Sequence, residues 1–436
     1  MRYRFLLINC YIIFIILVIN IQFLYSFSEL KITAYDGYPL DYFGCSVAIC
    51  DSYAIIGAYG VDDNYNNRQG SAYIYKRTVD SWIYDTKLIP NDSNEDNNDK
   101  RSFGDTVSID RNYAIVGDPG FTTTGCSYIF ARNSKGWTQA VRIIPDVTNS
   151  IKKPEGFGSS IFLDDRFLII GAPDSEVNEI YGAGAAYIYR RKETGDWVKV
   201  CELTASDHIR RNQEFGKSVS ISGNFAIVGA SGQGIGSVFI FKTENSGYTW
   251  NRHQVITSND NSEEFGYSVS IFENYILVGD RYNSKAYLYK YNNSLWEQVH
   301  LFKGFENSQF GRYVSIYKNY AIIGAYLEVV NEFQTGAAYI YELNNANKIF
   351  KKVFANDLFS SGRNFGARVY ISNNFAIVGA SKDDTNGEES GAAYIYNYKD
   401  YLYPFTWDID KNNKLSLADI IYAIQTMSGM KLQRNK

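Results

Sequence analysis

Residues 43–58 have the sequence FGCSVAICDSYAIIGA, and residues 70–75 have the sequence GSAYIY. The first stretch holds a Phe-Gly pair and then an apolar run that ends in Gly-Ala, and the second alternates small with large side chains. The same three phrases return six more times along the 436 residues. Self-similarity with a period of about 50 residues indicates a repeat architecture and takes precedence over any local pattern.

The spacing between the first two phrases is invariant. Each Gly follows its Phe by 14 positions in all seven copies. This constant length predicts two antiparallel strands joined by a tight turn, because the length of a hairpin sets the register of its strands. The pairs begin at Phe43, Phe103, Phe157, Phe215, Phe265, Phe310 and Phe365, and the runs end at Gly57, Gly117, Gly171, Gly229, Gly279, Gly324 and Gly379.

Each copy contains two further segments with strand character. A fourth segment often follows the third phrase, as in residues 82–89, and both are rich in Tyr, Phe, Ile and Val, which suit a pleated, buried surface. Seven units of four strands predict an all-β fold, a seven-bladed β-propeller. The third phrases are centred on Tyr73, Tyr128, Tyr187, Phe239, Tyr287, Tyr339 and Tyr394, at variable distances from the preceding Gly.

The two ends of the repeat region predict how the ring closes. The seventh copy has no fourth strand in the usual place, and residues 30–34, LKITA, copy the LTA of residues 203–205 in a fourth strand. We therefore expect residues 30–34 to complete blade seven, which removes exposed sheet edges. The propeller domain is predicted over residues 29–398.

Residues 1–28 are predicted to be a secretory signal peptide. Arg2 and Arg4 precede a run with few polar residues from Phe5 to Leu24, and the SFS of residues 26–28 is a small-x-small cleavage pattern. An uncleaved membrane anchor is the alternative, because the run approaches the roughly 20 residues that span a bilayer. We expect no transmembrane span beyond this leader, and a location outside the cell or on its surface.

Charge and cysteine content narrow the class of protein. The net charge of −4 and the absence of a basic stripe argue against nucleic acid as a partner. The cysteines after the leader, Cys45, Cys50, Cys126 and Cys201, are interpreted as small buried apolar side chains in preference to a disulfide framework. We expect a monomer that binds an extracellular protein or glycan.

A Phe-Gly pair followed by a strand that ends in Gly-Ala resembles the FG-GAP repeat, the unit of the integrin α-subunit propeller. All seven copies show the pattern, so the resemblance covers residues 30 to about 398. Some copies depart from it: Asp118 and Asp280 replace the final Ala, and Tyr313 and Arg368 replace the Ser of Phe-Gly-x-Ser. The resemblance implies the fold, whereas one fold carries many functions.

Integrin-type repeats often insert a calcium loop of the form Asp-x-Asp-x-Asp-Gly between the first two strands. Here the constant spacing leaves room only for a tight turn, so the resemblance does not carry those calcium sites over to this propeller. The chain is more similar to the bacterial secreted FG-GAP proteins, whose copies contain Phe-Gly-x-Ser-Val.

The direction of the strands predicts one loop-rich face. Connections from strand two to strand three and from strand four to the next blade leave the same rim, where a rigid scaffold presents binding residues. Blades six, seven and one have long loops there, and we predict that their carboxylates form an acidic binding crescent; simple solvation of charged loops is the alternative. The crescent comprises Asp62, Asp63, Glu328, Glu332, Asp383, Asp384, Glu388 and Glu389. The acidic segment at residues 91–99 is interpreted as a surface loop.

The tail, residues 399–436, is predicted to hold a linker, a calcium loop of EF-hand type and a helix. In an EF-hand, oxygen ligands at loop positions 1, 3, 5, 7, 9 and 12 wrap the ion. Asn413 stands where Gly is usual, and an Asp ends the loop, which resembles one half of a dockerin repeat. The alternative is an amphipathic helix after an Asn-rich turn. The expected ligands are Asp408, Asp410, Asn412, the Lys414 carbonyl, Ser416 and Asp419.

The sequence favours a binder over an enzyme. The three histidines, His208, His253 and His300, lie in different repeats, and no Gly-x-Ser-x-Gly, Walker or His-Glu-x-x-His motif occurs. We predict a secreted or surface protein that is adhesive and non-catalytic. The alternatives are a hydrolase or lyase that acts on polysaccharide with carboxylates at the channel mouth, and a purely structural surface protein. Carboxyl groups with shifted pKa values at the central channel would favour the enzyme.

Overall fold

The computed structural model describes residues 29–398, except residues 63–68, 80, 92–100, 121–123, 149, 260–261, 263, 331, 347 and 356–362. The chain divides into a unit of residues Leu30–Ile395 and a unit formed by Met1–Glu29 and Tyr396–Lys436. Within the second unit, the Tyr396 hydroxyl donates a hydrogen bond of 3.1 Å to the Glu29 carboxylate. The predicted signal peptide, the calcium loop and its helix lie outside the described residues.

The described repeat region is all-β, and its seven blades each have four strands, as predicted. Blade one comprises β2 (Ser46–Ile49), β3 (Tyr53–Ala58), β4 (Ser71–Arg77) and β5 (Trp82–Leu88); blade two comprises β6 (Thr106–Ile109), β7 (Tyr113–Asp118), β8 (Cys126–Asn133) and β9 (Gly136–Ile143); blade three comprises β11 (Ser160–Leu163), β12 (Phe167–Ala172), β14 (Ala185–Arg191) and β15 (Trp197–Leu203); blade four comprises β16 (Phe215–Ser222), β17 (Phe225–Ala230), β18 (Ser237–Lys242) and β19 (Asn251–Thr257).

The remaining blades follow the same order along the chain. Blade five comprises β20 (Phe265–Phe272), β21 (Tyr275–Asp280), β22 (Lys285–Tyr291) and β23 (Trp296–Lys303); blade six comprises β24 (Phe310–Tyr317), β25 (Tyr320–Ala325), β26 (Ala337–Glu342) and β27 (Ile349–Val353); blade seven comprises β28 (Arg368–Ile371), β29 (Phe375–Ala380), β30 (Ala392–Asn397) and β1 (Glu29–Ile32). A small sheet pairs β10 (Ile151–Lys153) with β13 (Glu176–Val177), and two 3-10 turns, η1 (Ser206–His208) and η2 (Leu343–Asn345), complete the described elements.

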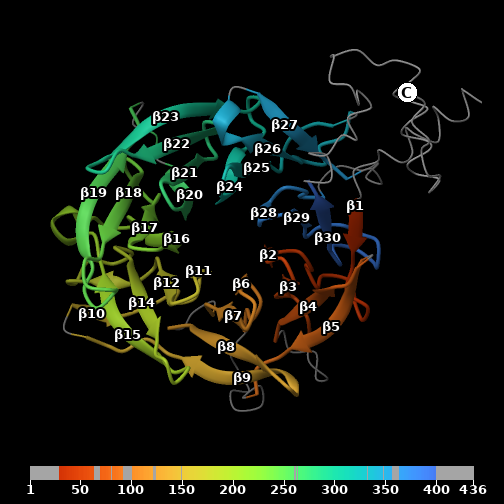
Figure 1. Cartoon of the computed structure of the whole chain (residues 1–436), viewed down its shortest axis with the longest axis horizontal. Helices are drawn as coiled ribbons and strands as arrows, with labels where there is room; N and C mark the ends of the chain where they lie inside the picture. Colours follow the sequence, from red (N-terminus) through yellow and green to blue (C-terminus); the bar gives the residue numbers. More distant parts are fainter. Residues whose placement is uncertain are drawn as a thin grey trace, which may run out of the picture. The chain divides into compact units, whose positions relative to one another are not determined.

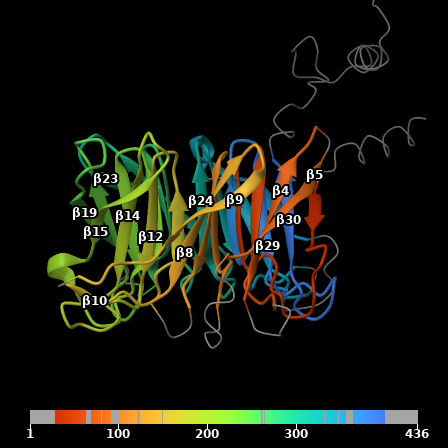
Figure 2. The same cartoon turned by 90° about the horizontal axis from the view of Figure 1, so that it is seen from below.

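Seen down the axis of the Leu30–Ile395 unit, the first strand of every blade lies nearest the centre and the fourth lies at the rim (Figure 1). Seen from the side, the strands run between two faces, and the linker strand β10 lies at the lower one (Figure 2). The loops that connect strands two and three share this face with the blade-to-blade linkers, because Leu40 and Tyr42 of the first linker bond to the carbonyl groups of Glu388 and Glu389. This face is called the loop face.

The ring closes as the sequence predicts. The seventh sheet has the order β1-β30-β29-β28, so the first strand of the chain supplies its fourth strand. Phe43 of blade one also forms a parallel bridge with Gly391 of blade seven. Trp82 packs edge-on against Phe375, with ring centroids 5.3 Å apart. Closure therefore combines strand pairing with aromatic packing.

The Phe of every Phe-Gly pair is a core residue of its own blade. All seven are fully buried, and each ring packs edge-on against the aromatic ring at the centre of the third strand. In blade one the Phe43 and Tyr73 centroids are 5.3 Å apart, and in blade seven those of Phe365 and Tyr394 are 5.2 Å apart. Such pairs contribute about 0.5–1.5 kcal/mol each beyond the burial of their area. The Phe of the first sequence phrase and the aromatic residue of the third phrase are therefore packing partners in every blade.

The Gly of the pair and the hydroxyl that follows it join neighbouring blades. Gly104 has a φ of +97°, and a Cβ built on it would lie 2.3 Å from the carbonyl oxygen of Ser71 in the preceding blade. The Ser46 hydroxyl of blade one donates a 2.7 Å hydrogen bond to the Gly104 carbonyl. Equivalent bonds link Thr106 to Gly158, Ser160 to Gly216, Ser218 to Gly266 and Ser268 to Gly311. We call this bond the blade latch.

Two further predictions can be compared with the structure. Cys45, Cys50, Cys126 and Cys201 are free thiols, which confirms the interpretation as unpaired side chains, although Cys50 and Cys201 are only partly buried. No described helix combines the length and apolar character needed to cross a membrane.

Candidate functional site

The residue between the Gly and the hydroxyl of each Phe-Gly-x-Ser phrase faces the central channel. The Phe points into the blade and the Gly touches the preceding blade, so the next side chain is directed toward the axis. These seven side chains ring the channel near the loop face: Cys45, Asp105, Ser159, Lys217, Tyr267, Arg312 and Ala367. These seven positions carry seven different kinds of side chain, in contrast to the Phe and Gly that precede them in every copy.

The latch position departs from Ser or Thr in blades six and seven. Tyr313 and Arg368 stand there, and the guanidinium of Arg368 stacks on the Tyr313 ring, 3.8 Å from its centroid. No latch hydroxyl is therefore present at the joints between blades six and seven and between blades seven and one. Two hydrogen bonds, each about 0.5–1.5 kcal/mol, are replaced by side chains that face the channel.

The channel mouth on the loop face contains a cavity of about 680 Å³. This volume lies within the roughly 300–1,000 Å³ that is typical of ligand pockets. Tyr42 and Tyr59 stack at its edge with centroids 5.0 Å apart, and Tyr181 lies at the edge in blade three. Deeper in the channel, the rings of Phe162 and Tyr370 stack with centroids 6.4 Å apart. They separate the mouth from a second cavity, which opens on the opposite face of the propeller. We call the cavity the mouth pocket.

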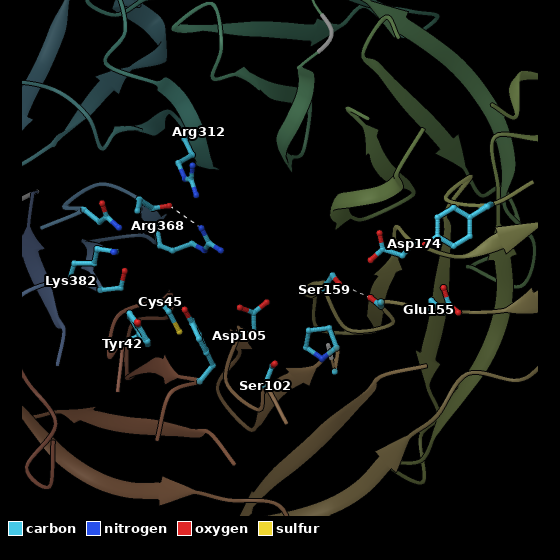
Figure 3. Close-up of a pocket in the computed structure, with 18 residues that line it drawn as sticks. Tyr42, Cys45, Ser102, Asp105, Glu155, Ser159, Asp174, Arg312, Arg368 and Lys382 are labelled. Atoms are coloured by element: carbon cyan, nitrogen blue, oxygen red, sulfur yellow. Dashed lines mark hydrogen bonds between the residues drawn. The ribbon is translucent and has the colours of Figure 1, made fainter. Parts of the chain in front are cut away.

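One side of the mouth pocket is acidic. Figure 3 shows Asp105 of blade two and Asp174 and Glu155 of blade three around it. Burial raises the pKa of the Asp105 carboxyl, and the opposing effect of Arg368 and Lys217 does not cancel it. Burial also raises the pKa of Asp174, where Lys217 opposes and Glu214 and Glu155 reinforce the shift.

The other side is cationic and comes from blades six and seven. Arg312 and Arg368 face the cavity from β24 and β28 (Figure 3). The Arg312 guanidinium lies 4.3 Å from the Tyr326 ring centroid, and its Nε atom is buried with no hydrogen-bond partner among the described residues. Arg368 donates one hydrogen bond of 3.2 Å to the Ala367 carbonyl. Among the described residues, no carboxylate lies within ion-pair distance of either guanidinium.

The structure gives two members of the predicted crescent a structural role. Asp383 and Glu328 are buried below the loops, so their carboxylates are not part of an exposed surface. Glu328 accepts hydrogen bonds of 2.6 Å from both the Tyr339 hydroxyl and the Lys352 ammonium. Asp383 accepts a hydrogen bond from Lys31 at 3.0 Å and another from Tyr394 at 3.3 Å.

These contacts repeat a rule that sequence reasoning missed. In blade one the partner carboxylate is Asp36, which bonds the Tyr73 hydroxyl at 2.9 Å and Lys87 at 2.7 Å. In blades one and six the Tyr and the Lys are cross-strand neighbours on strands three and four. A Lys on strand four directly opposite the buried Tyr of strand three was the sequence feature that could have predicted a buried carboxylate partner.

The other crescent residues remain at the loop face. Asp62, Glu332, Asp384 and Glu388 are exposed, and Asp63 lies outside the described residues. Glu389 pairs with Lys382 at 2.6 Å, and Asp384 lies 3.5 Å from Arg363, so basic groups offset part of the acidic charge. The predicted calcium ligands Asp408, Asp410, Asn412, Lys414, Ser416 and Asp419, together with most of the acidic segment at residues 91–99, lie outside the described residues. Among the described ranges, no three His, Cys, Asp or Glu side chains are grouped closely enough to hold a metal.

Comparison with known proteins agrees with this fold. The FG-GAP repeat family matches residues 27–75, 197–241, 304–341 and 350–396. No curated protein matches the chain. A solved structure of the mitotic checkpoint complex is similar over 86% of this chain and 96% of that chain, with a TM-score of 0.53 and 10% identity. The solved structure of Sqt1 of Saccharomyces cerevisiae has a TM-score of 0.45 and 10% sequence identity to this chain. The match covers 84% of this chain and 97% of Sqt1. Together, the seven sheets and the matched segments identify the chain as a seven-bladed β-propeller, four segments of which match the FG-GAP repeat.

Proposed function

We propose that the chain is a non-catalytic binding protein, secreted or held at the cell surface, which engages an extracellular glycan or protein through its loop face. The observation that carries the proposal is the mouth pocket, where Arg368 of blade seven stands in place of a latch hydroxyl. Tyr313, which replaces the latch hydroxyl of blade six, stacks on the Arg368 guanidinium. The propeller gives up two blade latches, each worth about 0.5–1.5 kcal/mol, for side chains that face the channel, and a ligand is the reason we offer. The predicted N-terminal signal peptide and the resemblance to extracellular FG-GAP proteins support the location.

An array experiment tests the proposal. The chain without residues 1–28 is applied to an array of glycans and extracellular proteins, beside a variant in which Arg312 and Lys382, both at the mouth pocket, are changed to Ser. We expect the unmodified chain to label a restricted set of spots and the variant to lose them. A matched control changes Lys76 and Arg132, two exposed basic residues outside the pocket, and should keep them. Labelling that the pocket variant retains in full would refute a binding role for the pocket.

A polysaccharide hydrolase or lyase is the second candidate, favoured by the raised pKa values of Asp105 and Asp174 in the channel. A carboxyl group whose pKa is raised by its surroundings is the usual general acid of such enzymes. Incubation of bound glycans with the chain, followed by measurement of new reducing ends or unsaturated products, separates the candidates. Turnover that Asp105→Asn abolishes would establish the enzyme, and unchanged glycans would support the binder.

Residues 408–419 are proposed as a calcium loop, on the strength of their oxygen-bearing side chains at EF-hand positions. Titration of the whole chain with millimolar calcium should release heat. The same titration of a variant with Asp408 and Asp410 changed to Ala should not, because the first two carboxylate ligands are gone. Equal heat from both proteins would place calcium binding elsewhere in the chain.

A further inference from the structure

The two sides of the mouth pocket have opposite character, and this restricts the chemistry of a ligand. Blades six and seven contribute Arg312 and Arg368, whereas blades two and three contribute Asp105, Glu155 and Asp174 (Figure 3). A ligand that fills the pocket must satisfy cations at one side and hydrogen-bond acceptors at the other. Resting on the proposed binding function, we infer that the mouth pocket takes an acidic carbohydrate, with its anionic group on Arg312 and Arg368.

The cationic side is prepared for an anion. Tyr313 covers one face of the Arg368 guanidinium at 3.8 Å, and Tyr326 lies 4.3 Å from that of Arg312. Stacking holds a guanidinium by its face and leaves its N–H groups at the edge. One N–H group of Arg312 donates to the Gln309 side chain and one of Arg368 donates to the Ala367 carbonyl, and the others can bond to a carboxylate or sulfate. The buried Nε of Arg312, which lacks a partner among the described residues, is a donor that such an anion would satisfy.

A neighbouring arginine shows what a completed pair looks like in this protein. The Arg281 guanidinium lies 4.0 Å from the Tyr267 ring centroid, which resembles the stacked arrangement of Arg368. Arg281, however, donates two hydrogen bonds to the Glu264 carboxylate, at 2.6 Å and 2.9 Å. The protein therefore supplies a carboxylate to Arg281 from its own chain, and the described residues supply none to Arg312 or Arg368. An external carboxylate or sulfate would complete the same geometry.

The acidic side distinguishes a sugar from an acidic peptide. Asp105, Asp174 and Glu155 would repel a segment with several carboxylates, because like charges in a partly buried site destabilise each other. They accept hydrogen bonds from neutral hydroxyl groups, together with Ser102 and Ser159 at the same cavity. The Tyr42–Tyr59 pair offers an aromatic face for the apolar side of a sugar ring. One anionic group next to several hydroxyl groups matches both sides at once.

The decisive variant is Arg368→Ser. Five copies carry Ser or Thr at this position, and each hydroxyl bonds the Gly carbonyl of the next blade, as Ser46 bonds Gly104 at 2.7 Å. The substitution therefore removes the channel cation while it introduces the side chain that the fold uses elsewhere. We expect the variant to fold and to melt at the same temperature as the unmodified chain or higher. A loss of binding in this variant could not be attributed to unfolding.

Binding is measured by calorimetry with three matched oligosaccharides: an oligogalacturonide, a sulfated galactan fragment and a neutral galactan fragment of equal length. The unmodified chain should bind at least one acidic fragment. It should bind the neutral fragment at least about tenfold more weakly, because the neutral fragment has no anionic group to pair with the arginines. Arg368→Ser should weaken binding of the acidic fragment by about tenfold or more. Arg132→Ser removes an equal charge from an exposed site outside the pocket and should change affinity by less than about twofold.

The two acidic fragments separate a carboxylate from a sulfate as the preferred anion, and preference for either supports the inference. Absence of binding to both acidic fragments would overturn it, as would equal binding of the neutral fragment or an affinity that Arg368→Ser leaves intact. Stronger binding of a poly-glutamate peptide, abolished by Arg368→Ser, would replace the sugar with an acidic peptide. If the array shows a ligand that binds independently of Arg368, the binding function stands and this inference alone fails.

Discussion

Asp383→Ala is expected to destabilise the propeller by about 3–5 kcal/mol, because it leaves buried partners without their counter-charge. The Asp383 side chain is fully buried and receives Lys31 at 3.0 Å, with Arg363 3.7 Å away. Lys31 lies on β1, the strand that closes the ring, and Asp383 lies on the loop between β29 and β30. The substitution therefore weakens the attachment of the closing strand to blade seven. Urea unfolding followed by tryptophan fluorescence measures the loss.

The same pair predicts how the effect changes with pH. Burial by itself raises the pKa of Asp383, but hydrogen bonds from Thr385 and Lys31 outweigh burial and hold the pKa below its ordinary value. A carboxyl group with a depressed pKa in the folded protein stabilises the fold above the unfolded pKa of about 3.9, and this contribution is lost as the pH falls through the folded pKa. The difference in unfolding free energy between the unmodified chain and Asp383→Ala should therefore shrink below about pH 4.

Asp384→Ala provides the control. Asp384 is the next residue, is exposed, and lies 3.5 Å from Arg363, so its loss should cost no more than about 1 kcal/mol. Equal destabilisation by the two substitutions, or a difference that persists unchanged into acid, would show that Asp383 does not hold the closing strand through its charge.

Gly104→Ala is expected to lower the free energy of unfolding by about 2–4 kcal/mol, because it strains a left-handed backbone and forces two blades apart. At a φ of +97° an alanine is strained, and its Cβ would approach the Ser71 carbonyl oxygen to 2.3 Å and the Ala58 amide nitrogen to 3.1 Å. Both contacts are with the backbone of blade one, which cannot move aside as a flexible side chain can. Thermal or urea unfolding checks the value.

Gly136→Ala separates the two causes. Gly136 has a similar φ of +102°, but a Cβ built on it meets no atom within 4 Å. Only the backbone strain applies there, so the expected cost is about 1–2 kcal/mol. If both variants lost the same free energy, blade contact at Gly104 would contribute nothing, and the explanation of the repeated Gly would have to be conformational alone.

Local chemistry in the sequence determined most of the fold. A constant distance between Phe and Gly predicts the first hairpin, because a two-stranded turn admits no change of length without a change of register. The Phe-Gly pair and the third-strand Tyr recur together, and in the structure the two rings touch in every blade. The repeat count and the missing fourth strand of the last copy were sufficient to predict closure by residues 30–34, of which Leu30–Ile32 belong to β1.

The candidate site was less accessible to sequence reasoning. The sequence predicts that the charged loop residues form an exposed surface, yet Glu328 and Asp383 are buried against Tyr and Lys side chains of neighbouring strands. Their burial depends in part on Lys352 and Lys31, which lie 24 and 352 residues away along the chain, so the signal is a pairing between strands and not a local pattern in the loop. Tyr313 and Arg368 did stand out in the sequence, as departures from a repeated Ser, but without an assigned role.

The sequence by itself determined what every copy needs in order to be a blade: the hairpin length, the buried Phe, the close-packed Gly and the number of units. Only the tertiary structure decided what the copies do together, because the residue after each Gly faces the axis once seven blades surround it. Asp105 and Arg368 are 263 positions apart in the sequence and face the same cavity. The residues that recur in every copy make the contacts within a blade and between neighbouring blades. The residues that differ between copies meet only because the ring places all seven of them around one channel.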